Sequence, residues 1–390
     1  MRLHKMSSVC AGGVLCAAVG VGLNLSAAPP PPKLTGGNGT LYIGGYPNKV
    51  FIIDEATQKV SGAMEMTTGL PRGGVLSNDG KRFYFANINN EQVEIFDVAS
   101  RKSLDHFTLS EGLKRVMISS LTPDPNNQFL VMVIRTREKK IDHWEISPAA
   151  LVVYDLATHR IRETIPWPNG EERASASLMI SPDGKLLYFF ADQEVLIFST
   201  TDWKQVDTWA LGLPTEQGLG ARFELGPRET TYEEPGFYTS LFTVQDAVQN
   251  RRLMGIARVN LNAKSVQFWP IGPARQVSFA MTPDRKRAYG IASAVGGSVT
   301  VKQAYEFWTF DVESHKVISK IEFAGRARMA LRPSSNGKVL YVYQAGNMID
   351  LYEASTGKYL QTIVLDGDSS TALWVVPPPA ATPPRPSSLN

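Results

Sequence analysis

The sequence predicts an all-β chain that folds as a seven-bladed β-propeller closed by its C-terminal strand. Three observations support this prediction. A hairpin pattern recurs seven times, a second pattern between the hairpins predicts a tight turn, and one β-forming run near the C-terminus has no repeat of its own. A chain of 390 residues exceeds one ordinary hydrophobic core, so two domains or a closed repeat are expected, and the repeats favour the second.

Each hairpin consists of an alternating apolar run, a polar turn and a second alternating run. The seven copies begin at Val50, Val93, Leu151, Val195, Ile256, Phe307 and Ile349. Alternation with a period of two around a polar turn is typical of paired strands. Copies spaced by roughly 40 to 60 residues match one four-stranded propeller blade each.

The second pattern places a Pro, Asp, Asn or Gly turn between two more strands. Its copies begin at Leu76, Leu121, Ile180, Met281 and Leu331. Proline presets φ, while Asp and Gly tolerate left-handed backbone, so these residues predict the turn between the two inner strands. The fifth repeat lacks the turn sequence, and its inner strands are expected at residues 219–225 and 237–245.

The first repeat has no innermost strand of its own, because only the proline-rich run APPPPK precedes LYIGGY at Leu41. The run TALWVVP from Thr371 is the unassigned strand. Placing this run as the inner strand of the first blade closes the ring and leaves no open edge.

The ends of the chain predict export and tethering. Residues 1–27, with Arg2, Lys5, an apolar stretch rich in glycine and a small-residue end, resemble a signal peptide, and a membrane anchor is the alternative. Residues 28–39 read as a Pro/Gly-rich linker, 40–377 as the propeller and 378–390 as a proline-rich tail. A periplasmic or secreted protein with no membrane span after processing is expected.

Composition limits the chemistry of the mature chain. Both cysteines, Cys10 and Cys16, lie in the signal segment, so no disulfide, Cys-containing metal site or CxxCH haem attachment is expected afterwards. Basic and acidic residues nearly balance, which argues against nucleic-acid binding. We therefore expect no bound cofactor and no metal.

Repeated polar residues suggest turns rather than a ligand ring. The residues that end the first strand of each hairpin are Asp54, Asp97, Asp155, Ser199, Asn260, Asp311 and Glu353. Such side chains commonly satisfy turn backbone at the outer rim. His159 and His315 fall in outer turns of different blades and cannot meet, so a histidine metal cluster is not expected.

The connections between the second and third strands of the blades differ in length, which indicates one face of the propeller with longer loops. The third blade has a long connection from Thr136 to Ala149, and the fifth and sixth have longer ones than the remaining blades. Long loops on a rigid scaffold commonly carry binding, although neutral length drift is the alternative. The predicted partner-binding residues are Arg137, Lys139, Lys140, His143 and Trp144.

Arginines also recur before the innermost strand of six blades. They are Arg72, Arg115, Arg173, Arg222, Arg275 and Arg326, with Arg328 as an alternative to the last. These residues could bind an anion at the mouth of the channel or could be rim structure repeated with the blade. The inner strands lack carboxylates, which disfavours a metal-dependent propeller hydrolase.

Three stretches make the chain resemble the β subunit of quinohemoprotein amine dehydrogenase, within the exported YVTN-type propellers. They are IDHWEISPAALVVYDLATHR at 141–160, FYTSLFTVQDAVQNRRLMGIARVNL at 237–261, and GDSST at 367–371. The proline-rich tail and parts of the fifth blade depart from the family pattern.

The resemblance implies a periplasmic subunit without a cofactor or catalytic residues of its own, which is held against a quinone-bearing subunit and a dihaem subunit. The chain is then expected to be a non-catalytic scaffold that helps to enclose a partner's active site. A stand-alone exported propeller that binds a protein or small-molecule ligand at one face is the alternative.

Overall fold

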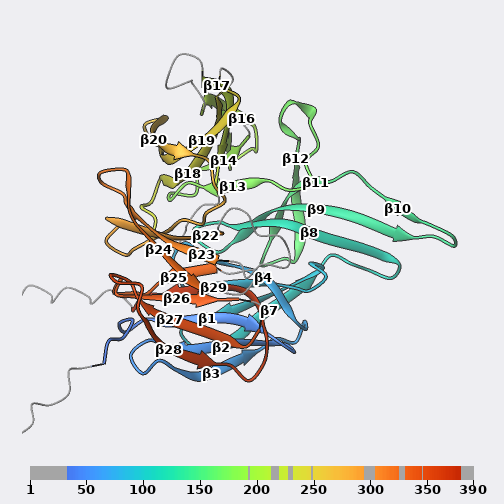
Figure 1. The fold of residues 1–390 in the computed structure, drawn as a ribbon. Coiled ribbons are helices and arrows are strands. Elements are labelled where there is room, and N and C mark those ends of the chain that lie inside the picture. Colours follow the sequence, from blue (N-terminus) through green and yellow to red (C-terminus); the bar gives the residue numbers. More distant parts are fainter. Residues whose placement is uncertain are drawn as a thin grey trace, which may run out of the picture. The chain divides into compact units, whose positions relative to one another are not determined.

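The computed structural model describes residues 33–191, 194–211, 219–226, 232–246, 249–293, 304–324, 330–344 and 346–378. Within these ranges the chain forms 29 strands and one 3-10 turn, η1 (Pro168–Gly170), but no α-helix. No helix in the described ranges is long and apolar enough to cross a membrane. Figure 1 shows the strands grouped in successive antiparallel sheets.

Seven sheets form the blades, whose strands run in order from the inner to the outer edge. Blade 1 contains β29 (Ser369–Val376), β1 (Thr40–Gly45), β2 (Lys49–Asp54) and β3 (Lys59–Glu65). Blade 2 contains β4 (Pro71–Leu76), β5 (Arg82–Asn87), β6 (Gln92–Asp97) and β7 (Lys102–Thr108). Blade 3 contains β8 (Lys114–Pro123), β9 (Phe129–Lys139), β11 (Ala150–Asp155) and β12 (Arg160–Ile165), with β10 (Trp144–Ile146) paired to β9.

The remaining blades are regular. Blade 4 contains β13 (Ser177–Ile180), β14 (Leu186–Phe190), β15 (Glu194–Ser199) and β16 (Gln205–Ala210). Blade 5 contains β17 (Leu219–Leu225), β18 (Phe237–Asp246), β19 (Arg251–Asn260) and β20 (Ser265–Pro273). Blade 6 contains β21 (Ala280–Met281), β22 (Arg287–Ser293), β23 (Ala304–Asp311) and β24 (Lys316–Ala324). Blade 7 contains β25 (Ala330–Pro333), β26 (Val339–Tyr343), β27 (Met348–Glu353) and β28 (Tyr359–Val364).

The hydrophobic core is distributed between blades. Seven buried clusters occur in the described residues, and each joins two consecutive blades, the last joining blade 7 to blade 1. In that last cluster Leu41 of blade 1 packs with Tyr341 of blade 7. Because every blade buries one face against each neighbour, the sheets close into a ring, as predicted for a seven-bladed propeller.

The C-terminal strand completes blade 1, which confirms the predicted closure. Strand β29 pairs antiparallel with β1, with Leu373 opposite Ile43 and Val375 opposite Leu41. The Thr371 hydroxyl accepts the Gly44 N–H at 2.8 Å. Blade 5 also follows the sequence prediction, since β17 and β18 are paired inner strands.

The turns explain the repeated polar residues. In each hairpin the fourth residue after the acid position has left-handed backbone: Gln58, Arg101, His159, Trp203, Lys264, His315 and Gly357. In the inner turn of blade 2, Ser77 donates to Asp79 at 2.5 Å and Gly80 has φ 68°. Blade 4 repeats this arrangement at Ser181, Asp183 and Gly184. Local side chains therefore stabilise the backbone reversals that the sequence predicted.

Candidate docking site

Blade 3 carries the most distinctive surface element. Strands β8 and β9 run on beyond the body of their blade, and β10 adds a third strand beside the end of β9 (Figure 1). Trp144 lies opposite Lys139, and Ile146 lies opposite Arg137. Half of the region predicted as a loop from Thr136 to Ala149 therefore lies in strands β9 and β10. Together with the start of β8 these strands form a three-stranded extension, which we call the arm. Trp144, which the sequence analysis placed in a loop, lies in strand β10.

The two faces of the arm differ in charge. Residues directly opposite in an antiparallel pair share a face, and Arg115 of β8 is opposite Arg137 of β9. The cationic face includes Arg115, Arg135, Arg137, Lys139, Trp144 and Ile146. The Lys139 ammonium lies 5.4 Å from the centre of the Trp144 ring, which places a cation over an aromatic ring on this face.

The opposite face has its charges paired. Glu138 lies opposite Glu145, and Lys140 sits between these two carboxylates at 2.7 Å and 3.2 Å. Hydrogen bonds to both carboxylates raise the pKa of the Lys140 ammonium. Lys114, the remaining cation of this face, is opposite Glu138. The opposite face therefore carries two acids and two lysines and is close to neutral.

The end of the arm exposes large apolar side chains. Ile141 is 103% exposed, Leu113 66%, Ile146 58% and Trp144 48%. Leu113 lies just before β8, and its carbonyl accepts the Lys139 N–H at 3.1 Å. Scattered apolar residues are ordinary on a protein surface, but a group on one projecting element is typical of an interaction site.

The base of the arm is anchored to the connection between blades 3 and 4. The Glu172 carboxylate accepts the Ala149 N–H at 2.8 Å and pairs with Arg135 at 2.6 Å. These two interactions, the backbone hydrogen bond first, lower the pKa of the Glu172 carboxyl. The Ser119 hydroxyl donates to the Ala174 carbonyl at 2.6 Å. The arm is therefore attached by side-chain bonds as well as by its strand ladder.

The predicted partner-binding residues divide between the two surfaces. Arg137, Lys139 and Trp144 lie together on the cationic face. Lys140 is held by its two glutamates on the opposite side, and His143 lies 2.7 Å from its neighbour Asp142 at the tip. Sequence reasoning missed Arg115 and Ile146 as members of this surface, because their membership depends on strand register.

The described members of the predicted channel-mouth arginines have contacts that differ from blade to blade. Arg72 donates to the Ile88 carbonyl at 3.4 Å, and Arg275 pairs with Glu306 at the same distance. Arg173 pairs with Glu171 and lies over the Phe189 ring. The side chain of Arg222 and the whole of Arg326 and Arg328 lie outside the described residues. The two interpretations given for these arginines, an anion site and rim structure, therefore stay predictions.

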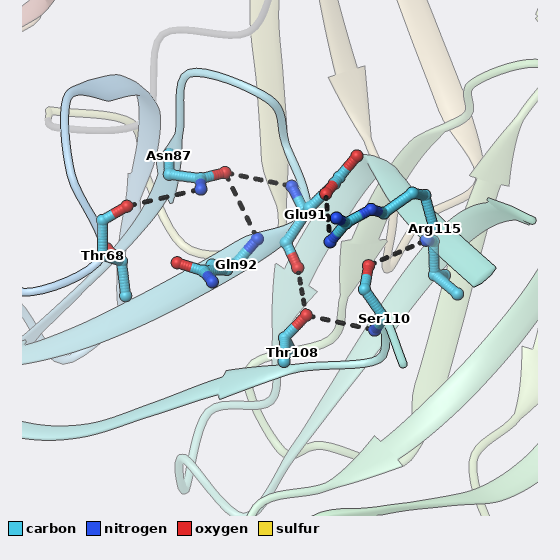
Figure 2. Close-up of polar contacts among 8 residues, drawn as sticks. Thr68, Asn87, Glu91, Gln92, Thr108, Ser110 and Arg115 are labelled. Carbon is cyan, nitrogen blue, oxygen red and sulfur yellow. Dashed lines mark hydrogen bonds and ion pairs between the residues drawn. The ribbon is translucent and has the colours of Figure 1, made fainter. Parts of the chain in front are cut away.

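Arg115 belongs to a polar network around the connection between β5 and β6 (Figure 2). The Asn87 amide oxygen accepts the N–H groups of Glu91 and Gln92, and its nitrogen donates to the Thr68 carbonyl. The Glu91 carboxylate in turn lies 3.8 Å from the Arg115 guanidinium. The turn of blade 2 is thus fixed next to the start of the arm.

The repeated acids are occupied by their own turns. Asp97 accepts the Ser100 N–H at 2.6 Å, and Asp311 accepts the Ser314 N–H at 2.7 Å. Hydrogen bonds from the turn backbone lower the pKa of both carboxyls. Among the residues that the structure describes, no group of three His, Cys, Asp or Glu side chains is arranged to hold a metal ion.

The face of the inner turns has a cavity of about 980 Å³. Its lining includes Asp79, Met179 and the blade 5 segment that precedes β18. In that segment Glu233 accepts the Thr239 N–H at 2.5 Å, and burial raises the pKa of its carboxyl. Glu234 pairs with Arg258 at 2.5 Å. The acids contributed by blade 5 therefore stabilise the segment itself.

Comparisons with known proteins support the fold and leave the family open. No protein-family model matches the chain. Antigen Lp49 of Leptospira interrogans is 30% identical over 123 residues, which is 31% of this chain and 24% of that protein, so the match spans about a quarter of the relative.

Among solved structures, apo AztD from Citrobacter koseri aligns with a TM-score of 0.51 and 12% identity over 88% of this chain and 98% of AztD. The dihydro-heme d1 dehydrogenase NirN aligns with a TM-score of 0.47 and 12% identity over 90% of this chain and 78% of NirN. Identity this low concerns the fold alone. The alignment with AztD indicates a shared fold, and the comparisons do not place the chain in the amine dehydrogenase β-subunit family.

Proposed function

We propose that this chain is an exported, non-catalytic propeller scaffold that docks a partner protein through the arm. The main support for this proposal is the group of exposed apolar side chains on the arm, which projects from blade 3 and is anchored at its base. Interfaces draw most of their energy from a few aromatic and arginine anchors that become buried. Trp144 and Arg137 are residues of this kind on one face of the arm.

The finer proposal is that the partner is a quinone-bearing subunit in the periplasm. One of the three stretches of the resemblance, residues 141–160, coincides with the tip of the arm and the strands that follow it. An N-terminal segment of signal type supports export. In this proposal the propeller supplies a rigid docking surface, and the redox chemistry belongs to the partner.

The test compares two pairs of exposed apolar residues. The protein is tagged, expressed in its native host and purified with whatever binds it. One variant combines Trp144→Ala and Ile146→Ala, and the control combines Leu104→Ala and Val206→Ala, residues that are 51% and 57% exposed on outer strands. Loss of a hot spot of about 2 kcal/mol should lower the affinity for the partner about 30-fold.

The outcomes separate the two levels of the proposal. Co-purification that is lost in the arm variant and retained in the control supports docking through the arm. Equal recovery of the same partner with both variants contradicts it. A recovered partner without visible absorption or quinone-dependent staining contradicts the quinone-bearing assignment but leaves docking through the arm intact.

A stand-alone propeller that binds a small ligand is the second candidate. The cavity of about 980 Å³ on the face of the inner turns favours it, because small-molecule sites have volumes of this order. Asn78→Trp, at an exposed residue of the cavity lining, should obstruct ligand binding there without affecting a partner that docks on the arm.

A further inference from the structure

The cationic face carries an unfavourable charge arrangement. Arg115 and Arg137 lie directly opposite each other on adjacent strands, and like charges in this position destabilise a sheet. Arg135 and Lys139 flank Arg137 at two residues' distance and therefore project from the same face. Four cations thus gather along two short strand segments.

Few acids compensate these cations. Arg135 has Glu172 at 2.6 Å, and Arg115 has Glu91 at 3.8 Å. Arg137 and Lys139 make no ion pair with any residue that the structure describes. The opposite face of the same arm, by contrast, places one lysine between two glutamates. The imbalance is therefore specific to one face.

The inner nitrogens of the arginines are shielded from a docked partner. The Nε atoms of Arg135, Arg137 and Arg173 are buried, and none of them has a hydrogen-bond acceptor within the described ranges. Arg173 belongs to the connection between blades 3 and 4, against which the base of the arm lies. A docked carboxylate would therefore be bound by the two terminal nitrogens of a guanidinium, which can donate two parallel hydrogen bonds to it.

We infer that the cationic face binds an extended, acidic segment of the partner protein. This inference rests on the proposed docking function and specifies its chemistry. Alternate residues of an extended segment are about 7 Å apart, which is also the spacing of Arg137 and Lys139 along β9. Carboxylates at alternate positions can therefore meet both cations, while an apolar side chain between or beside them packs on Trp144 and Ile146.

An acidic protein segment fits this face better than nucleic acid does. The whole chain has a formal net charge of only +3, and the cationic strip is short and interrupted by apolar side chains. Nucleic-acid surfaces need extended phosphate neutralisation. A carboxylate-bearing segment needs two or three cations with an apolar anchor next to them, as the arm provides.

The experiment uses the full mature chain and a short synthetic peptide in which Glu alternates with Thr around a central Leu. Its analogue carries Gln in place of Glu, and a single-stranded oligonucleotide of similar length serves as a third probe. Binding is measured by fluorescence anisotropy at about 0.02 M and about 0.2 M NaCl. The two variants are Lys139→Glu and Lys114→Glu, both on exposed lysines of the arm but on opposite faces.

We expect the acidic peptide to bind the wild-type protein, with an affinity that falls as the salt concentration rises. Lys139→Glu should lower this affinity about tenfold, because the substitution replaces an attraction by a repulsion. Lys114→Glu makes the same charge change on the other face and should alter affinity less than twofold. The Gln peptide and the oligonucleotide should bind at least tenfold more weakly.

Several results would overturn the inference: no binding of the acidic peptide at millimolar concentration, equal binding of the Gln peptide or the oligonucleotide, or equal losses with both lysine variants. Co-purification of the natural partner distinguishes this failure from failure of the docking proposal. A partner that is lost with Trp144→Ala and Ile146→Ala but retained with Lys139→Glu supports docking and contradicts the acidic segment.

Discussion

Leu373→Ala tests whether β29 is an integral strand of blade 1. The Leu373 side chain is fully buried in the cluster shared by blades 1 and 7. Buried Leu→Ala substitutions cost about 2–5 kcal/mol, since they lose apolar burial and leave a cavity. This loss is a large part of the roughly 5–15 kcal/mol by which a folded domain is typically stable.

The strand also makes contacts that other substitutions can test. The Trp374 ring packs edge-on against Phe83 and Phe85 of blade 2, with centroids 5.7 Å and 5.4 Å away. The Ser370 hydroxyl donates to the Pro71 carbonyl, also in blade 2, at 2.6 Å. Truncation after Asp366 removes all these contacts together and should destabilise the ring more than Leu373→Ala does.

The assay is urea unfolding followed by tryptophan fluorescence and circular dichroism. Leu373→Ala should lower the urea midpoint clearly, while Ala372→Ser, on the exposed side of the same strand, should leave it nearly unchanged. An unchanged midpoint for Leu373→Ala, together with unchanged unfolding of the protein truncated after Asp366, would rule out closure by this strand.

Four other substitutions have defined outcomes. Trp308→Ala should cost about 3–5 kcal/mol in thermal or urea unfolding because the ring is 3% exposed, whereas Trp144→Ala should change stability by less than about 0.5 kcal/mol. Burial raises the pKa of the Glu55 carboxyl, so ionisation of this group disfavours the folded state. The free energy of unfolding should therefore decline as pH rises through the folded pKa. Urea midpoints measured over a pH series should show this decline in the wild type and not in Glu55→Gln. Hydrogen bonds from its turn lower the pKa of Asp97. The contribution of Asp97 to the free energy of unfolding should be complete above its unfolded pKa of about 4 and should disappear as pH falls through the folded pKa. Asp97→Ala should therefore lower the melting temperature at pH 7 more than at pH 3.

The propeller was predictable because each blade repeats local signals that agree with one another. The inner turns place Asp79 and Asp183 where a Ser hydroxyl donates to them. The outer turns place Asp97 and Asp311 where backbone N–H groups need acceptors. These interactions span only a few residues, so their sequence spacing is sufficient to predict them.

The arm was not predictable as a set of strands because its sequence lacks apolar alternation. From Arg135 to Lys139 every residue is polar, and the period-two signal of a half-buried strand disappears. Pairing with β8 nevertheless extends β9 through this segment. Register between distant strands decides that Arg115 joins the cationic face and that Lys140 is held by glutamates on the other side.

Left-handed backbone in the outer turns accounts for two of the histidines. His159 and His315 have φ of 56° and 58° at equivalent positions of blades 3 and 6. Histidine is among the residues found in this conformation more often than most. Residue type alone does not fix the sign of φ, so this explanation required the structure.

The most direct test of docking through the arm is site-specific photo-crosslinking in the native host. A photoreactive phenylalanine derivative replaces Ile141 at the tip of the arm or, as the control, Tyr359 on an outer strand; the two residues are 103% and 52% exposed. Docking through the arm predicts a defined cross-linked partner from position 141 and none from position 359. A partner captured from position 359 and not from position 141 would contradict it.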